Sequence, residues 1–532
     1  MVADPIEIEA LVIGSGFGGA IAACRLGQRG VATIVLERGR RWSVDEAADT
    51  FCTYRNPDGR AAWLSDETVM FEPKPIDRYV GLLERHVEDG ITVWSAAGVG
   101  GGSLVYNTVL YQPGQTLFER VFPGEVSYAE MDANWYPLVA DTMQPAEIPG
   151  DVLQSEQYRS TRIMIEQAGF AGLPVHKATI ASDWDVIRAE IAGVRKPAAI
   201  SGEIWYGINS GAKNSLDRNY LAMAEDTGVV DLRPLHDVKR ISEAENGGFR
   251  VECDRIDERG EVLERLVFLT RRLFFGAGSM GTSKLLVRAK ATGALPKLNE
   301  EIGRHWGNNG DTFATRNAGT LTNPGQGGPA SIIVEDHDNP ILPQSLIVYP
   351  EWDAPEGTLT TLGMSLPGEL GAFGYDAGTD RVTLTFSMES PENRKMIDAA
   401  NLTYGRLDAG NPYTLSPVGS LSFKGHFHCP VNGFPEKSTE NQAGNGAVAN
   451  GGVTAHPLGG AVMGRACDLF GRVKGYSGLY VVDGAFIPGS TAAANPAFTI
   501  AAFAERSMSD ILAKDFAGRD ARGREAEATP AE

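Results

Sequence analysis

Three glycines near the start of the chain have the spacing of a turn that binds a dinucleotide. Gly14, Gly16 and Gly19 follow an apolar stretch at residues 10–13, which predicts a strand, and precede residues 20–30, which predict a helix. In such a turn the first glycine permits a sharp bend, the second lets the backbone approach a pyrophosphate, and the third lets the helix pack on the strand. This segment therefore predicts phosphate binding by backbone N–H groups at a helix N-terminus.

An acidic residue stands where the ribose of a dinucleotide is expected. Glu37 follows a second apolar stretch at residues 32–36, which predicts the second strand of a βαβ unit. A carboxylate at this place accepts hydrogen bonds from an adenosine ribose. The alternative for the glycines is a packing turn without a ligand, but strand, helix, strand and glutamate in this order favour the dinucleotide.

Three further glycine loops favour FAD over NAD. They lie at residues 98–103, 276–281 and 483–484, each at a predicted strand end or before a predicted helix. The first motif alone does not distinguish the two cofactors. A long, bulky FAD needs many close backbone approaches, which only glycine permits without steric conflict.

Four segments resemble those of the GMC (glucose-methanol-choline) oxidoreductases, in the branch that contains cholesterol oxidase. They are Val-Gly-Gly-Gly-Ser-Leu at 99–104, Phe-Gly-Ala-Gly-Ser-Met-Gly at 275–281, His-Pro-Leu-Gly-Gly at 456–460, and the glycine-bounded segment 475–489. The resemblance implies an α/β fold with a GMC-type, Rossmann-like FAD-binding domain and a substrate-binding domain with a large mixed or antiparallel β-sheet. The expected FAD domain combines residues 1–43, 215–306 and 453–515. The expected substrate domain combines 44–214 and 307–452, and 516–532 form a disordered tail.

The resemblance also implies non-covalent FAD and a set of residues that contact it. These expected cofactor residues are Gly14, Ser15, Gly16, Phe17, Gly18, Gly19, Glu37, Arg38, Gly98, Gly100, Gly101, Gly102, Ser103, Asn107, Val238, Gly276, Ala277, Gly278, Asp483, Gly484, Asn495 and Pro496.

Oxidation of an alcohol removes the hydroxyl proton and passes a hydride to the flavin, so the site needs a hydrogen-bond acceptor beside the cofactor. His456 and Asn495 hold the family positions that lie over the flavin. The alternative for His456 is a core histidine before a tight turn. Asn495 before Pro496 is also a good helix start, and both roles are compatible. A helix that begins there would direct its positive end at the flavin.

Glu356 is the expected counterpart of a family carboxylate that shifts a steroid double bond after oxidation, and an exposed loop glutamate is the alternative. Asn107, Thr108 and Val109 depart from the family pattern nearby, which indicates a pocket of different shape.

These residues predict an oxidoreductase that converts a secondary, cyclic and apolar alcohol of sterol or terpenoid type to a ketone. Its electrons pass to O₂ or to another, unknown acceptor. A second hypothesis is a dehydrogenase or desaturase that acts on a carbon–carbon bond of a cyclic ketone. A third is an FAD-bearing binding protein without turnover.

Composition excludes several other classes of protein. The 532 residues carry a formal charge of −20, which disfavours nucleic acids and anionic membranes as partners. No apolar run approaches the length of a membrane span and no signal peptide is apparent, so a cytoplasmic location is expected. His426, His428 and Cys429 are candidate metal ligands, but no second cluster supports them, and no metal is expected.

Overall fold

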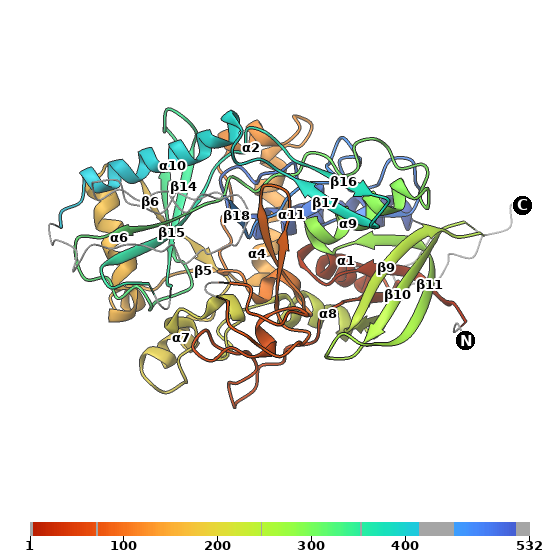
Figure 1. Ribbon diagram of the computed structural model, residues 1–532, viewed down its shortest axis with the longest axis horizontal. Coiled ribbons are helices and arrows are strands. Elements are labelled where there is room, and N and C mark those ends of the chain that lie inside the picture. Colours follow the sequence, from red (N-terminus) through yellow and green to blue (C-terminus); the bar gives the residue numbers. More distant parts are fainter. Residues whose placement is uncertain (1–3, 71–72, 246, 352–353, 414–451, 518–532) are drawn as a thin grey trace, which may run out of the picture.

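The computed structural model of the protein describes residues 4–70, 73–245, 247–351, 354–413 and 452–517. Two large sheets lie toward opposite ends of an elongated molecule, and helices and loops connect them (Figure 1). Within this described part of the chain, no helix is both long and apolar enough to cross a membrane. The α/β architecture with a mixed sheet and an antiparallel sheet confirms the expected fold class.

The first sheet has seven strands in the order β8-β2-β1-β11-β10-β9, with β19 also paired to β11. The pairs β8–β2, β2–β1, β1–β11 and β11–β19 are parallel, whereas β9, β10 and β11 form an antiparallel meander. The strands are β1 (Ile6–Ile13), β2 (Thr33–Leu36), β8 (Val230–Arg233), β9 (His236–Glu243), β10 (Phe249–Ile256), β11 (Val262–Phe275) and β19 (Leu479–Val481).

The turn after β1 places the helix that follows it in close contact with the ends of neighbouring strands. Helix α1 (Phe17–Gln28) begins three residues earlier than the apolar pattern predicted. A Cβ atom on Gly18 would lie 2.1 Å from the Val482 carbonyl oxygen, and one on Gly19 would lie 2.0 Å from the Gly14 carbonyl oxygen. Only glycine at these two places lets the helix N-terminus approach the sheet this closely.

The second sheet has five strands in the order β12-β15-β14-β13-β6, and every pair is antiparallel. One face packs on helices α6 (Arg159–Phe170) and α10 (Pro391–Ala409), which cover it in Figure 1. The opposite face carries Ile347 and Leu362, which lie in one hydrophobic cluster with Trp94 and Val109. The strands are β6 (Val175–Lys177), β12 (Thr312–Asn317), β13 (Ile332–Asp336), β14 (Gln344–Tyr349) and β15 (Thr358–Met364).

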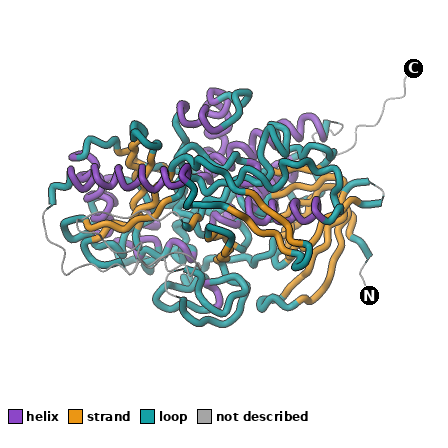
Figure 2. Tube along the Cα trace, turned by 45° about the horizontal axis from the view of Figure 1, so that its top comes forward, coloured by secondary structure: helices purple, strands orange, loops and turns teal. Residues whose placement is uncertain are grey.

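The remaining strands and helices lie between and around the two sheets, as the tube view shows (Figure 2). The strands are β3 (Leu83–Val87), β4 (Thr92–Ala96), β5 (Ala146–Glu147), β7 (Thr179–Ile180), β16 (Ala372–Asp376), β17 (Arg381–Thr385) and β18 (Val453–Thr454). The helices are α2 (Gln115–Val121), α3 (Tyr128–Glu130), α4 (Tyr136–Met143), α5 (Gly150–Leu153), α7 (Trp184–Ile191), α8 (Tyr220–Asp226), α9 (Gly278–Ala291) and α11 (Pro496–Asp515).

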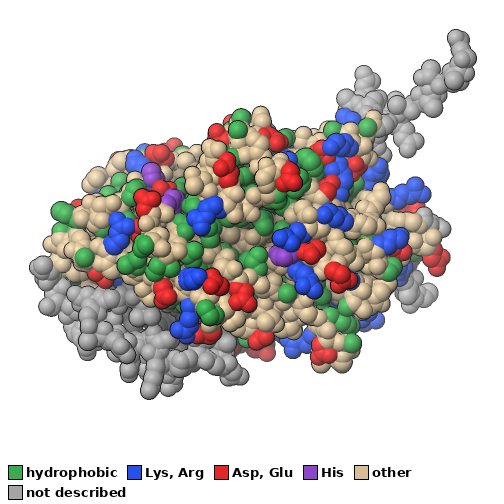
Figure 3. All heavy atoms as spheres, turned by 90° about the horizontal axis from the view of Figure 1, so that it is seen from above, with side chains coloured by type: hydrophobic (Ala, Val, Ile, Leu, Met, Phe, Trp, Pro, Cys, Tyr) green, Lys and Arg blue, Asp and Glu red, His purple; other side chains and the backbone are tan. Residues whose placement is uncertain are grey.

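Cations and anions are interspersed on the face drawn in Figure 3. The negative charge of the whole chain therefore does not gather into one acidic surface on this side.

Candidate active site

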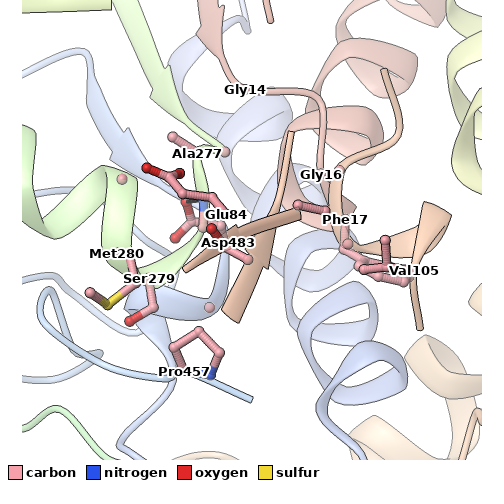
Figure 4. Close-up of a pocket in the computed structure, with 18 of the residues that line it drawn as sticks. Gly14, Gly16, Phe17, Glu84, Val105, Ala277, Ser279, Met280, Pro457 and Asp483 are labelled. Atoms are coloured by element: carbon pink, nitrogen blue, oxygen red, sulfur yellow. Dashed lines mark hydrogen bonds between the residues drawn. The ribbon is translucent and has the colours of Figure 1, made fainter. Parts of the chain in front are cut away.

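A cavity of about 520 Å³ lies between the two sheets, at the carboxyl ends of the parallel strands. The segments that follow β1, β2, β11 and β19 all contribute to its lining, and the second sheet closes it through Ile347 and Leu362. Figure 4 shows residues from these distant segments gathered around one space. Ligands of open α/β sheets bind at this end of the strands.

Glycine backbone forms one wall of the cavity. Gly14 has a φ of +87°, and a Cβ atom there would lie 2.6 Å from the Ala277 Cα atom. Gly101 has a φ of +53°, and its Cβ atom would lie 2.8 Å from the Gly16 Cα atom. Among the described residues, no side chain caps the N-terminus of α1, whereas the first N–H group of α9, that of Gly278, donates to Asp483 Oδ2 at 2.8 Å. The first N–H groups of α1 are thus free to bind phosphate oxygens.

His456 lines the cavity and has a partner that the sequence did not reveal. Its Nδ1 atom lies 2.8 Å from the Oδ1 atom of Asp311. The Asp311 side chain is fully buried, whereas that of His456 is 16% exposed. The ring is thus held on one side by a carboxylate.

Asn495 also lines the cavity, and its Oδ1 atom is buried without a hydrogen-bond partner in the described part of the chain. Asn495 is the N-cap residue of α11 and Pro496 is its first residue, as the sequence predicted. The side chain, however, makes no capping hydrogen bond within the described structure. A buried acceptor without a partner is costly, so this oxygen is suited to a ligand that donates a hydrogen bond.

The far side of the cavity is apolar. Trp94 and Trp205 are buried, and the Trp205 ring meets the Tyr349 ring edge to face at 5.8 Å. We call this side the apolar wall, formed by Met70, Trp94, Val109, Trp205, Ile347 and Leu362. The cavity thus combines a polar backbone cradle, two polar side chains and an apolar wall, as sites for organic ligands do.

Comparisons with known proteins agree with this geometry. The model of a family described as GMC oxidoreductase matches residues 389–504. A cholesterol oxidase of Acinetobacter baumannii is 26% identical, and the alignment covers 97% of this chain and 96% of that protein. A cholesterol oxidase of Mycobacterium tuberculosis (strain ATCC 25618 / H37Rv) is 27% identical, with 94% and 91% covered. The crystal structure of pyridoxine 4-oxidase from Mesorbium loti superposes with a TM-score of 0.62 at 14% identity, over 94% of this chain and 99% of that one.

The chain is similar to GMC oxidoreductases over nearly its whole length. The family match, the nearly full-length similarity and the common fold together make the protein a flavin-dependent oxidoreductase. The glycine cradle, His456 and Asn495 were predicted from the sequence, and the structure brings them to one cavity.

The Glu37 carboxylate binds the backbone of the glycine turn and of two neighbouring loops. Its Oε2 atom accepts hydrogen bonds from the Ser15 N–H at 3.0 Å and the Ser15 hydroxyl at 2.7 Å. Its Oε1 atom accepts from the N–H groups of Gly39 at 2.8 Å and Gly98 at 3.3 Å. Glu37 also lines the cavity, so a ribose hydroxyl would share this carboxylate with protein donors.

Arg38 lines the cavity as part of an ionic cluster. It forms an ion pair with Glu84, and its guanidinium lies 5.1 Å from the centre of the Trp63 ring. Burial opposes the ionisation of Glu84, but Arg38 and His86 hold the pKa of its carboxyl at about 2. This cluster is therefore charged at neutral pH.

Four of the expected cofactor residues do not line the cavity in the described structure but lie behind its lining. They are Gly19, Gly98, Gly100 and Ser103. Gly19 packs the helix on the strand. The Ser103 hydroxyl donates to the Gly100 carbonyl at 2.7 Å and accepts from the Leu216 N–H at 3.0 Å. Gly98, Gly100 and Ser103 shape the loop that carries Gly101 and Gly102.

Most of the other expected cofactor residues line the cavity directly: Ser15, Phe17, Gly102, Asn107, Val238, Gly276, Gly278 and Gly484.

The buried lysine Lys213, which the sequence did not single out, supports the loop that precedes Asn107. Its Nζ atom donates to the carbonyl oxygens of Leu104 at 2.8 Å, Tyr106 at 2.9 Å and Ile204 at 3.1 Å.

Asp483 joins the last strand of the first sheet to the start of α9. Its Oδ2 atom accepts from the Gly278 N–H at 2.8 Å and from the Thr282 hydroxyl, and its Oδ1 atom accepts from the Ala485 N–H at 2.9 Å. Burial raises the pKa of this carboxyl to about 6, against the lowering effect of its donors. The residue lines the cavity as predicted.

The structure places Glu356 in an exposed loop, outside the described lining of the cavity. Its Oε1 atom accepts backbone N–H groups of Thr322, Asn323 and Gly357. Partial burial opposes ionisation, yet these donors lower the pKa of the carboxyl. This placement corrects the expectation of a site carboxylate, because the side chain closes its own loop.

A buried carboxylate missed by the sequence reasoning lies on the cavity side of the second sheet. Glu351 is 2% exposed and accepts a hydrogen bond from the Thr360 hydroxyl at 2.9 Å. It follows β14, whose alternate residues Ile347 and Tyr349 share one face with it. The alternation of side chains along β14 is the sequence signal from which the burial of Glu351 could have been predicted.

No group of His, Cys, Asp or Glu with metal-binding geometry occurs in the part of the chain that the structure describes. The segment with His426, His428 and Cys429 lies outside those residues.

Proposed function

We propose that this protein binds FAD non-covalently and oxidises a secondary, cyclic and apolar alcohol of sterol or terpenoid type to a ketone. The electrons pass on to O₂ or to another acceptor. The observation that carries the proposal is the convergence of the His456–Asp311 pair and the unpartnered Asn495 oxygen on one cavity with an apolar wall.

The residues present fit FAD. The backbone at Gly14 and Gly101 admits no Cβ atom, and the nearby N-terminus of α1 offers N–H groups to a pyrophosphate. Glu37 and Val238 would hold the adenosine part, at the edge of the first sheet. When bound, the flavin supplies the acceptor for the hydride. Non-covalent binding rests on the resemblance to cholesterol oxidase.

His456 and Asn495 would act on the alcohol itself. The ring of His456 is held through Nδ1, which leaves Nε2 to accept the hydroxyl proton. Asn495 presents its free oxygen in the same cavity and starts helix α11. The positive end of that helix stabilises negative charge that develops at the site.

The apolar wall favours an uncharged ring system. Trp94 and Trp205 offer large, rigid surfaces that gain free energy when they cover apolar groups and lose it when they cover charged ones. The six-residue wall has no ionisable side chain, so the substrate's polar contact would be confined to the His456 end.

The test is anaerobic mixing of the FAD-loaded protein with a panel of sterols, terpenoid alcohols and the matching ketones, while the visible absorbance of the flavin is followed. Bleaching by an alcohol, with the ketone as product, is the expected result. Recovery in air with release of hydrogen peroxide identifies O₂ as acceptor. Bleaching by a ketone would support carbon–carbon dehydrogenation instead, and no bleaching by any compound would support a binding protein.

A further inference from the structure

A buried four-residue segment, 308–311, contacts His456 and the loop that leads to Asn495. Asn308, Asn309 and Asp311 are all fully buried. Gly310 has a φ of +71°, and a Cβ atom there would lie 2.4 Å from the Ser365 backbone. The segment therefore has a fixed conformation against the second sheet.

Asp311 contacts His456 directly and also through Thr454. Its Oδ1 atom lies 2.8 Å from His456 Nδ1. Its Oδ2 atom accepts from the Thr454 hydroxyl at 2.7 Å, and the same hydroxyl accepts from the His456 backbone N–H at 2.9 Å. Because Thr454 donates to Oδ2, the carboxylate uses both oxygens as acceptors, and the ring nitrogen that faces Oδ1 must carry a proton.

Asn309 anchors the loop that leads to Asn495. Its Nδ2 atom donates to the Ala494 carbonyl oxygen at 2.9 Å. Its Oδ1 atom accepts from the Thr491 N–H at 2.8 Å and the Thr491 hydroxyl at 3.0 Å. One rigid segment thus fixes the position of His456 directly and that of Asn495 through its loop.

Asp311 has no lysine or arginine partner among the residues that the structure describes, so His456 is its only ionisable contact there. Charged groups elsewhere in the cavity lining have partners of their own. Arg38 pairs with Glu84, Lys284 pairs with Glu88, and Asp483 binds Thr282. A buried anion without a fixed cation favours a positive charge on the one ring that contacts it.

We propose that Asp311 is the positioning residue of the site: it fixes the Nδ1–H tautomer of His456, directs Nε2 at the substrate and stabilises the imidazolium that forms. This inference rests on the proposed function. In the reaction the O–H bond of the alcohol breaks and its proton goes to Nε2. The carbinol C–H bond breaks and its hydride, with both electrons, goes to the bound flavin. The C=O bond forms, and the new positive charge on His456 lies beside Asp311.

The experiment uses the FAD-loaded protein with ¹⁵N-labelled histidine, whose eight histidines give a countable spectrum. The His456 signal is assigned with a His456→Asn variant. We expect a protonated Nδ1 and an unprotonated Nε2 at neutral pH. If the amide oxygen of Asp311→Asn stays on Thr454, its NH₂ group faces Nδ1, so the Nε2–H tautomer of His456 should replace the Nδ1–H tautomer. With the proton on Nε2 the ring cannot accept the hydroxyl proton, so kcat should fall about 100-fold with a much smaller change in KM.

Asp336→Asn is the matched control. Asp336 is also a buried carboxylate, which accepts from Thr403 at 2.7 Å and pairs with Arg406 under α10, away from the cavity. It should lose stability without a change in the His456 tautomer. Should Asp311→Asn fail to fold, Thr454→Val retains the carboxylate but removes the hydroxyl that binds its Oδ2 atom, and a smaller loss of the Nδ1–H tautomer is expected.

A wild-type spectrum with the proton on Nε2 would overturn the proposal, as would an unchanged His456 tautomer in Asp311→Asn. Because the spectra need no substrate, they separate this outcome from a failure of the proposed function. If no alcohol reduces the flavin, the tautomer still decides whether Asp311 controls His456.

Discussion

The Glu37→Gln substitution tests how the glycine turn is held. The carboxylate accepts four hydrogen bonds, two on each oxygen, and it is 5% exposed. A glutamine keeps one acceptor oxygen. If that oxygen stays on Ser15, the new NH₂ group faces the N–H groups of Gly39 and Gly98, and both lose their acceptor.

The structure sets the size of the effect. The Gly39 contact at 2.8 Å is strong and the Gly98 contact at 3.3 Å is weak. A hydrogen bond to a charged group contributes about 1.5–3 kcal/mol, and a buried donor without a partner costs a similar amount. After relaxation of the two loops, a loss of about 2–4 kcal/mol in the free energy of unfolding is expected.

The assay is thermal unfolding of the FAD-free protein, together with a titration of FAD by quenching of its fluorescence. We expect a lower unfolding midpoint and a Kd for FAD raised about tenfold or more, since the turn that receives the pyrophosphate loses its anchor. Glu190→Gln is the control, because Glu190 is also buried and accepts the N–H groups of Ala198, Ala199 and Ile200 outside the described cavity lining. It should lower stability and leave the FAD affinity unchanged. An equal loss of FAD affinity in both variants, or none in Glu37→Gln, would refute the reasoning.

Three further predictions concern the cavity. Asn495→Leu should lower both the reduction potential of the flavin and turnover, because it removes the free buried oxygen and the polar start of α11; potentiometry that finds the potential unchanged would contradict this. Trp205→Ala should lower kcat/KM for ring alcohols about tenfold or more and spare small acyclic alcohols, measured by steady-state kinetics; an equal loss for both would show general damage. Asp483 has a folded-state pKa of about 6, above its unfolded value, so its neutral form stabilises the fold at low pH and this contribution is lost as pH rises toward 6 and beyond. Unfolding of wild type and Asp483→Asn at pH 5 and pH 7 should therefore show a wild-type advantage that is larger at pH 5, and a difference independent of pH would argue against this titration.

Local patterns in the sequence determined the parts of the site that one short segment builds alone. Gly14, Gly16 and Gly19 predicted a close turn, no Cβ atom fits at Gly14 or Gly19, and the cavity lining includes the first two. Asn495 and Pro496 predicted a helix start for the same local reason, and α11 begins there. These signals depend only on residues that are neighbours in the sequence, so they can be recognised before the fold is known.

The tertiary structure decided which polar groups meet. Asp311 and His456 lie 145 positions apart, and only the packing of segment 308–311 against β18 brings the carboxylate to the ring. For the same reason Glu356 closes a loop while Glu351 is buried on the cavity side of the second sheet. Two glutamates of equal chemistry differ in role because burial and partners come from strands far away in the chain, and a linear pattern carries no information about those distances.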